Sequence, residues 1–192
     1  ADGTYVNPQT GKPFLSNEQI AEVATYAKAR GVELIPELDM PSHIKGVLDL
    51  YAIKYGSSEL AKIAVDYSDN QIDFQKDESK ALVKSLIDEI TAKFGDSSQH
   101  FHIGGDEFMR ATEDNAQYIA FANELASYLK AKGLGVRMWN DAVLKTSVGE
   151  LDNDIEITYW YRGWDRGEEN VRATMPEIIA DGHQVLNYNG TY

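Results

Sequence analysis

The sequence contains no cysteine, which excludes a disulfide framework, a thiolate metal site and a cysteine nucleophile. Basic residues are also scarce, because 18 Lys and Arg stand against 31 Asp and Glu and leave a net charge of −13. Nucleic acid and anionic membrane surfaces are therefore disfavoured as partners. No apolar run approaches the roughly 18 residues that span a bilayer. What remains is ordinary globular composition, with 43% hydrophobic and 26% charged residues.

Apolar runs of strand length alternate with amphipathic segments of helical length along the whole chain. A first helix is predicted to begin at Ser16, which can form a capping box with Gln19, and to stop at Gly31. Its buried stripe is predicted to comprise Ile20, Val23, Ala24 and Ala27. Further helices are predicted at about 77–94 and 115–132, with a weaker one at about 168–180. Strands are predicted at 32–38, 101–104, 136–139, 155–160 and 184–188.

This repetition of βα units predicts a parallel sheet, either a doubly wound open sheet or a (β/α)8 barrel. Polar residues at or just after the strand ends favour the barrel, because barrels assemble their sites on that rim. These residues are Asp39 and His43, Asp106 and Glu107, Asn140 and Asp141, and Tyr161 and Arg162. Five strands cannot close the barrel, and the opening ADGTYVNP is not typical of a natural start. We therefore interpret residues 1–192 as one partial (β/α)8 TIM-type barrel domain that is truncated at both ends.

Asp106 and Glu107 are adjacent carboxylates that follow two glycines at the end of a predicted strand. Two neighbouring acids repel each other or share one proton, and such pairs suit acid and base chemistry. Because successive strand residues point to opposite sides, one carboxylate is expected below a ligand and the other above it. Gly104 and Gly105 are expected to leave room for this arrangement.

Trp139 and Trp160 each end a predicted strand and would place indole rings at the barrel mouth. Sugar rings favour such a wall, because their C–H faces are weakly apolar while their hydroxyls need hydrogen bonds. Core packing of the same indoles is the alternative interpretation. His102 is expected to be an orienting hydrogen-bonder, which is commoner than a metal ligand.

The segment His102-Ile103-Gly104-Gly105-Asp106-Glu107 resembles the HxGGDE signature of family 20 glycoside hydrolases, the β-N-acetylhexosaminidases. Three further segments match the family in the same order. Residues 34–43 (LIPELDMPSH) resemble its IPEIDMPGH segment, 138–141 (MWND) its strand end with tryptophan and acid, and 157–160 (ITYW) its next tryptophan-bearing strand. The resemblance covers essentially the whole chain and implies about strands 3 to 7 of a (β/α)8 barrel.

The resemblance implies a substrate-assisted mechanism, in which the 2-acetamido oxygen of the sugar attacks the anomeric carbon and net configuration is retained. Asp106 would accept the acetamide N–H and stabilise the oxazolinium intermediate. Glu107 would protonate the departing oxygen and later deprotonate water. The catalytic residues implied are therefore Asp106 and Glu107.

Five residues are implied to bind the substrate. Trp139 and Trp160 match the indoles that enclose the sugar and its acetamido group, and Asp141 matches the acid of the tryptophan-plus-acid segment. His43 would lie close to the acid. Tyr192, with Tyr188 as a rival, resembles the tyrosine whose hydroxyl bonds the acetamido oxygen.

The chain departs from the family pattern at Ser42, where glycine is usual. The family's sugar-binding arginine, an acid after the final tyrosine and a late tryptophan would lie beyond these residues, so the segment alone is expected to be inactive. The implied function is removal of terminal, non-reducing β-linked N-acetylglucosamine or N-acetylgalactosamine from glycans, outside the cell or at its surface. No cofactor, metal, nucleic acid or membrane span is expected.

Two other functions stay open. One is a metal-dependent barrel enzyme that uses Glu37, Asp39, His43, Asp106 and Glu107 as ligands. The other is a non-catalytic glycan-binding or scaffold segment, which would bind an N-acetylhexosamine without turnover.

Overall fold

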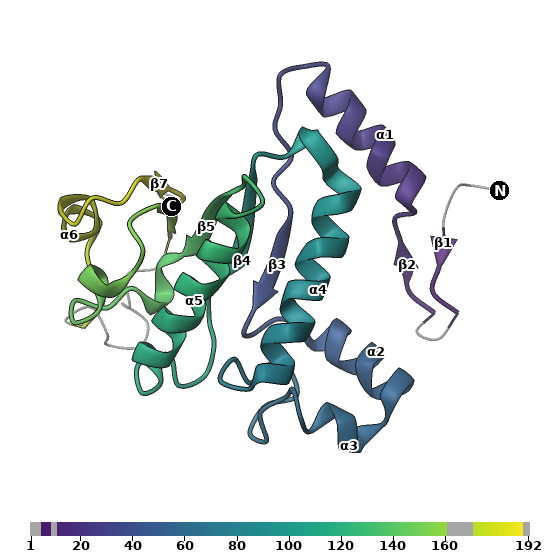
Figure 1. Ribbon diagram of the computed structural model, residues 1–192, viewed down its shortest axis with the longest axis horizontal. Coiled ribbons are helices and arrows are strands. Elements are labelled where there is room, and N and C mark those ends of the chain that lie inside the picture. Colours follow the sequence, from purple (N-terminus) through teal and green to yellow (C-terminus); the bar gives the residue numbers. More distant parts are fainter. Residues whose placement is uncertain (1–4, 9–10, 161–170, 190–192) are drawn as a thin grey trace.

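The computed structural model describes residues 5–8, 11–160 and 171–189. At its centre lies a parallel sheet of five strands in the order β3-β4-β5-β6-β7 (Figure 1). The strands are β3 (Glu37–Met40), β4 (His100–Gly104), β5 (Gly135–Trp139), β6 (Ile155–Tyr159) and β7 (Val185–Asn187). Neighbouring strands are parallel throughout. The sheet therefore confirms the number, order and direction of the predicted strands.

Helices cover one face of this sheet. The helices α4 (Asp77–Phe94) and α5 (Asn115–Lys130) lie across it, and α1 (Asn17–Lys28) packs against α4 (Figure 1). Alternate strand residues turn toward the helices and form one buried core with them. This core includes Leu38, Met40, Phe101, Ile103, Val136, Met138, Ile155, Ile157, Val83, Ile87, Leu125 and Leu129. The hydrophobic effect thus fixes which face of each strand turns inward to the helices.

The opposite face of the sheet is polar, because the intervening strand residues carry functional groups. These residues are Glu37, Asp39, His100, His102, Arg137, Trp139, Glu156 and Thr158. In a closed barrel this face lines the interior. At its N-terminal end, His100 bonds Glu33 at 2.9 Å, and Arg137 bonds Glu156 at 2.6 Å. The predicted site residues lie toward the other end, where the strands finish.

The capping box predicted for the first helix is confirmed, since Ser16 and Gln19 exchange both bonds. The predicted burial of Val23 is wrong, because its side chain is 50% exposed. Only Ala24 and Ala27 are buried in α1, and Ile20 is partly buried. The helix contacts its neighbours along a narrow stripe, so the outer edge of the predicted apolar face remains in solvent.

The first predicted strand, 32–38, is displaced in the structure, where β3 spans Glu37–Met40. Pro36 has no N–H to donate, although its carbonyl accepts from the His102 N–H at 2.9 Å. Regular pairing with β4 therefore begins only after the proline. As a result Asp39 lies within the strand.

The predicted helix at 168–180 is shorter, because α6 spans Met175–Ala180. Thr174 and Glu177 form a capping box that sets its first residue, and Arg172 instead pairs with Leu144 in an isolated bridge. Residues 168–170 lie outside the described part of the chain. Smaller differences affect only element ends, as at α5, which stops at Lys130.

The long segment after β3 folds into α2 (Lys45–Tyr55) and α3 (Ser57–Leu60), and β1 (Tyr5–Val6) pairs with β2 (Pro13–Phe14) in a short hairpin. Three 3-10 turns, η1 (Gly95–Ser97), η2 (Asn140–Ala142) and η3 (Val148–Glu150), complete the described elements. Among these elements, no helix is both long and apolar enough to cross a membrane.

Candidate active site

The predicted site residues meet at the C-terminal end of the sheet. A cavity of about 320 Å³ there is lined by Asp106, Glu107, Trp139, Trp160 and Tyr188. Trp139 is the last residue of β5, and the other four residues follow β4, β6 and β7. Because parallel strands deliver their C-terminal ends to one edge, residues far apart in sequence converge in this cavity.

Two glycines precede the carboxylates for a reason that differs from the prediction. Gly104 and Gly105 have φ values of +72° and +105°, which disfavour residues with a Cβ. A Cβ on Gly104 would collide with the Asp39 carboxylate and lie 2.6 Å from the Met40 nitrogen, and one on Gly105 would collide with the Tyr118 hydroxyl. The space that the glycines leave is therefore filled by β3 and by a buried tyrosine, not by a ligand.

Asp106 and Glu107 do not project from opposite faces of a strand, because β4 ends at Gly104. Glu107 has φ +47°, a left-handed conformation that turns the chain. His43 Nε2 lies 3.4 Å from Glu107 Oε2 and 3.8 Å from Asp106 Oδ2. One imidazole thus contacts both carboxylates, which stand side by side. The strand alternation from which an arrangement above and below a ligand was predicted is therefore wrong, because neither residue lies in β4.

His43 approaches these acids from the loop after β3. It also has a positive φ, +59°, and such strained residues gather at functional sites. The preceding Ser42 is buried and is not among the described residues with positive φ, so a serine fits where the family usually has glycine. The strain falls on the histidine.

Asp39, within β3, forms a carboxyl pair with Asp106. Burial, the charge of Asp106 and a hydrogen bond to it raise the pKa of Asp39 to about 8. Asp39 therefore carries a proton at neutral pH and donates it to Asp106. The Oδ1 atom of Asp106 is buried and has no hydrogen-bond partner among the described residues.

Asp141 is buried, with 3% of its surface exposed, and links two parts of the site. Its Oδ1 accepts from the Glu107 backbone N–H at 3.2 Å, and its Oδ2 accepts from Trp160 Nε1 at 2.8 Å. Burial outweighs these two bonds and raises the pKa of Asp141 to about 6. Asp141 thus supports Glu107 and Trp160 from behind.

The two indoles stand on separate supports. Trp139 Nε1 donates to Glu37 Oε1 at 2.8 Å, and its ring meets Tyr188 edge-on, with centroids 5.6 Å apart and planes at 88°. The Trp160 backbone N–H donates to Asn140 Oδ1 at 2.8 Å. Asn140 and Glu37 had no predicted supporting role. The only sequence signal for Asn140 was its position at a predicted strand end, beside Asp141. Glu37 had no such signal.

Some predicted residues fall elsewhere. Tyr192, Tyr161 and Arg162 lie outside the described residues. Tyr188, the rival of Tyr192, lines the cavity. His102 is a buried hydrogen-bonder, as predicted, with Nε2 at 2.8 Å from Thr158 Oγ1.

The alternative metal site is only partly assembled. Asp39, His43 and Asp106 bring one potential ligand atom each within 4.8 Å of one another. Glu37, another predicted ligand, instead accepts a hydrogen bond from Trp139 and contacts His102. The carboxyl pair already shares a proton, which a metal would have to displace.

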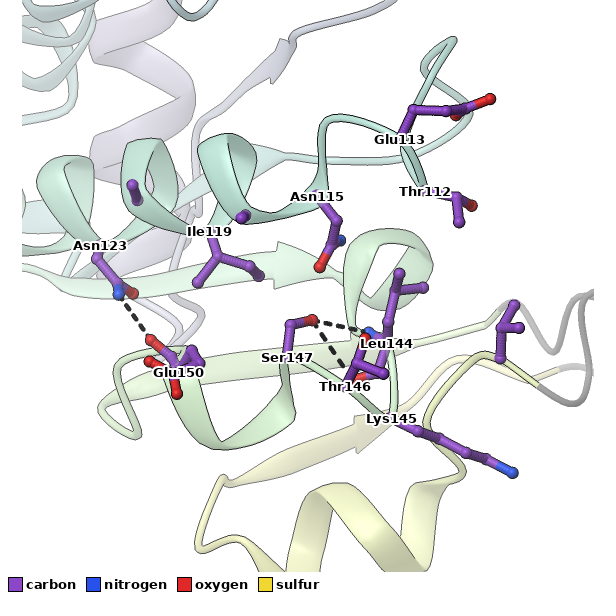
Figure 2. A pocket seen from close by; sticks show the side chains of 13 residues that line it. Thr112, Glu113, Asn115, Ile119, Asn123, Leu144, Lys145, Thr146, Ser147 and Glu150 are labelled. Carbon is purple, nitrogen blue, oxygen red and sulfur yellow. Dashed lines mark hydrogen bonds between the residues drawn. The ribbon is translucent and has the colours of Figure 1, made fainter.

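A larger cavity, of about 760 Å³, opens on the helix-covered side of the sheet (Figure 2). It lies between the first half of α5, including Asn115 and Ile119, and the segment 144–150. The chain between β5 and β6 makes only the short turns η2 and η3, which leaves this flank of α5 uncovered. Among the described residues, none of those predicted for the site lines this cavity, so volume alone does not locate the site.

Comparison with known proteins finds a match to one enzyme family over almost the entire chain. The sequence profile described as glycosyl hydrolase family 20, catalytic domain, matches residues 2–190. The crystal structure of dispersin B is similar to this chain, with a TM-score of 0.93 and 43% identity over 98% of this chain and 57% of that one. The likeness confirms the predicted fold, an incomplete (β/α)8 barrel.

Two curated relatives are more distant. A lacto-N-biosidase of Bifidobacterium bifidum is 25% identical over 91% of this chain and 16% of its own length. The β-hexosaminidase subunit A1 of Dictyostelium discoideum is 29% identical over 89% of this chain and 32% of its own length. The chain thus spans less than a third of either protein.

Proposed function

Because this chain belongs to glycosyl hydrolase family 20, we propose that it carries the catalytic acids of an enzyme that removes terminal, non-reducing β-linked N-acetylhexosamine from glycans. The observation that supports this most is the placement of Asp106 and Glu107 side by side, beside His43, in a cavity walled by two indoles. A neutral sugar ligand also suits a chain with a net charge of −13.

Asp106 acts on the acetamido group of the bound sugar. Asp106 lines the cavity with 19% of its side chain exposed, so its carboxylate accepts the acetamide N–H while Asp39 donates to it. This fixes the acetamido oxygen for attack on the anomeric carbon. The C–O bond to the leaving group breaks as the new C–O bond forms, which gives a cyclic oxazolinium ion beside a carboxylate.

Glu107 handles the proton. Its half-exposed carboxyl, with 48% of the side chain accessible, gives its proton to the departing glycosidic oxygen. The resulting carboxylate then takes a proton from water, which opens the oxazolinium ion at the anomeric carbon. Two successive displacements retain the configuration. His43, at 3.4 Å, stabilises the carboxylate between these steps.

Activity requires more of the barrel than the described residues provide. Within them, β3 pairs only with β4 and β7 only with β6, so the sheet has two open edges. The isolated chain is therefore expected to turn over slowly or not at all, whereas the full-length protein should be active. Action outside the cell remains a prediction.

The test compares full-length wild type with Glu107→Gln on two aryl N-acetylglucosaminides. The variant should lose on the order of 100-fold or more in turnover of a poor leaving group, and much less with a dinitrophenyl group, which departs without protonation. Asp106→Asn should impair both substrates and weaken inhibition by a thiazoline mimic of the oxazolinium ion. Equal losses for both leaving groups in Glu107→Gln would refute its role. Binding of N-acetylglucosamine without turnover by the wild type would instead indicate a glycan-binding module.

A further inference from the structure

The indole of Trp139 is held by a carboxylate from a distant strand. Trp139 ends β5, and its Nε1–H donates at 2.8 Å to Oε1 of Glu37, which opens β3 and lies 102 residues away in sequence. Strand β4 lies between these two strands. The contact therefore crosses the polar face of the sheet. Glu37 itself does not line the sugar cavity.

His102 of β4 fills the space that this contact crosses. It is paired in register with Glu37, and its Nδ1 lies 3.1 Å from Glu37 Oε1. Its ring centroid lies 4.8 Å from that of Trp139, with the planes tilted by 52°. The indole is thus held at its N–H edge by Glu37 and along its ring by His102.

The orientation of the His102 imidazole is fixed by the partners of its two ring nitrogens. The Thr158 hydroxyl donates to the Met138 carbonyl at 2.7 Å, so its oxygen accepts from His102 Nε2–H at 2.8 Å. Nδ1 lies 3.1 Å from the Gly104 N–H as well as from Glu37. Nδ1 therefore faces both a donor and an acceptor, while Nε2–H is held by Thr158.

Glu37 is an ionised acceptor in this arrangement. Burial raises the pKa of Glu37, but its hydrogen bond and charge interaction with His102 and its bond from Trp139 outweigh burial and hold the pKa below its ordinary value. A hydrogen bond from an indole N–H to a charged carboxylate is stronger than one to a neutral oxygen. The Trp139 ring is consequently confined to one orientation.

We propose that Glu37 and His102 are positioning residues, which lock the indole of Trp139 as a rigid wall of the cavity and so determine sugar affinity without touching the sugar. Stacking a sugar ring on an indole requires the face of the indole to be open and still. Glu37 takes the N–H edge, and the edge-on Tyr188 abuts the ring at 5.6 Å. The identity of the sugar rests on the proposed function, whereas the locking contact does not.

A double-mutant cycle in the full-length protein tests the kinetic part. Glu37→Ala should raise KM for an aryl N-acetylglucosaminide about tenfold, with kcat changed less than about twofold. Trp139→Phe keeps a ring but removes the donor, so the double variant should be no worse in KM than Trp139→Phe alone. Glu37→Gln, which keeps a neutral acceptor, should fall between wild type and Glu37→Ala. Fully additive effects on KM, or a loss confined to kcat, would overturn the proposal.

A spectroscopic readout is independent of turnover. In protein labelled with 5-fluorotryptophan, the Trp139 resonance is identified by its absence in Trp139→Phe, and Glu37→Ala should shift and broaden it. Glu33→Ala is the matched control, because Glu33 bonds His100 at 2.9 Å as Glu37 bonds His102, but far from Trp139. That control should leave the resonance unchanged. An unmoved resonance in Glu37→Ala, or an equal shift in both variants, would refute the locking contact even if the enzyme proves inactive.

Discussion

One carboxylate, Asp141, holds the backbone of Glu107 with one oxygen and the indole of Trp160 with the other, at 3.2 Å and 2.8 Å. The acid and the aromatic wall are therefore not positioned independently. A shift of the segment after β5 moves both at once. This coupling makes Asp141 a sensitive probe of the site, because its own side chain is buried behind the two groups it supports.

Asp141→Asn should lower kcat/KM of the full-length protein about tenfold or more. The Asn side chain has one acceptor oxygen, whereas Asp141 uses two oxygens to accept from the Glu107 N–H and from Trp160 Nε1. The measurement is steady-state hydrolysis of an aryl N-acetylglucosaminide. Asp152→Asn is the control, since Asp152 pairs with Lys130 at 2.7 Å away from the cavity and should leave the rate unchanged. Equal activity of Asp141→Asn and wild type would contradict the linking role.

Asp39→Asn should make stability less dependent on pH. The folded-state pKa of Asp39, about 8, is raised above its ordinary value of 3.8, so the folded protein binds this proton more tightly than the unfolded chain does. The stabilisation that this proton contributes is complete below a pH of 3.8 and is lost as the pH rises from there to about 8. The variant donates to Asp106 without titrating, so its melting temperature should fall less between about pH 5 and pH 8. Parallel curves for both proteins would contradict the shared proton.

Gly104→Ala should destabilise the fold by roughly 2–5 kcal/mol, since the left-handed φ and the collision with β3 both oppose a Cβ. Gly133→Ala provides the comparison, because Gly133 has φ +79° but nothing within 4 Å of its absent Cβ. That variant should lose only about 1–2 kcal/mol. Denaturant unfolding measures both, and similar losses would show that the close approach of β3 contributes nothing.

Removal of divalent metals should leave activity and melting temperature unchanged. The cluster of Asp39, His43 and Asp106 could offer three ligands, but its carboxyl pair is occupied by a shared proton. Dialysis against a chelator, followed by assay and thermal melting, measures both properties. A loss that one added metal restores would favour the metal-dependent alternative.

The sequence predicted most of the fold because its signals are local. The capping box at Ser16 and the helix predicted at about 115–132, which forms as α5, depend on residues close in sequence, and both are confirmed. The prediction failed where neighbours in space intervene. Val23 is apolar and correctly spaced, yet the described elements leave it exposed, and Pro36 delays the pairing of β3.

The sequence by itself determined the order of the βα units and the juxtaposition of Asp106 with Glu107, because periodicity and adjacency are properties of the chain. Only the tertiary structure decided which groups surround them. Glu37 meets Trp139, Asp39 shares a proton with Asp106, and Tyr118 fills the space beside Gly105. Each of these contacts joins separate strands or helices, so it depends on how the sheet is paired and how the helices cover it. Sequence patterns among neighbouring residues do not specify this pairing and packing.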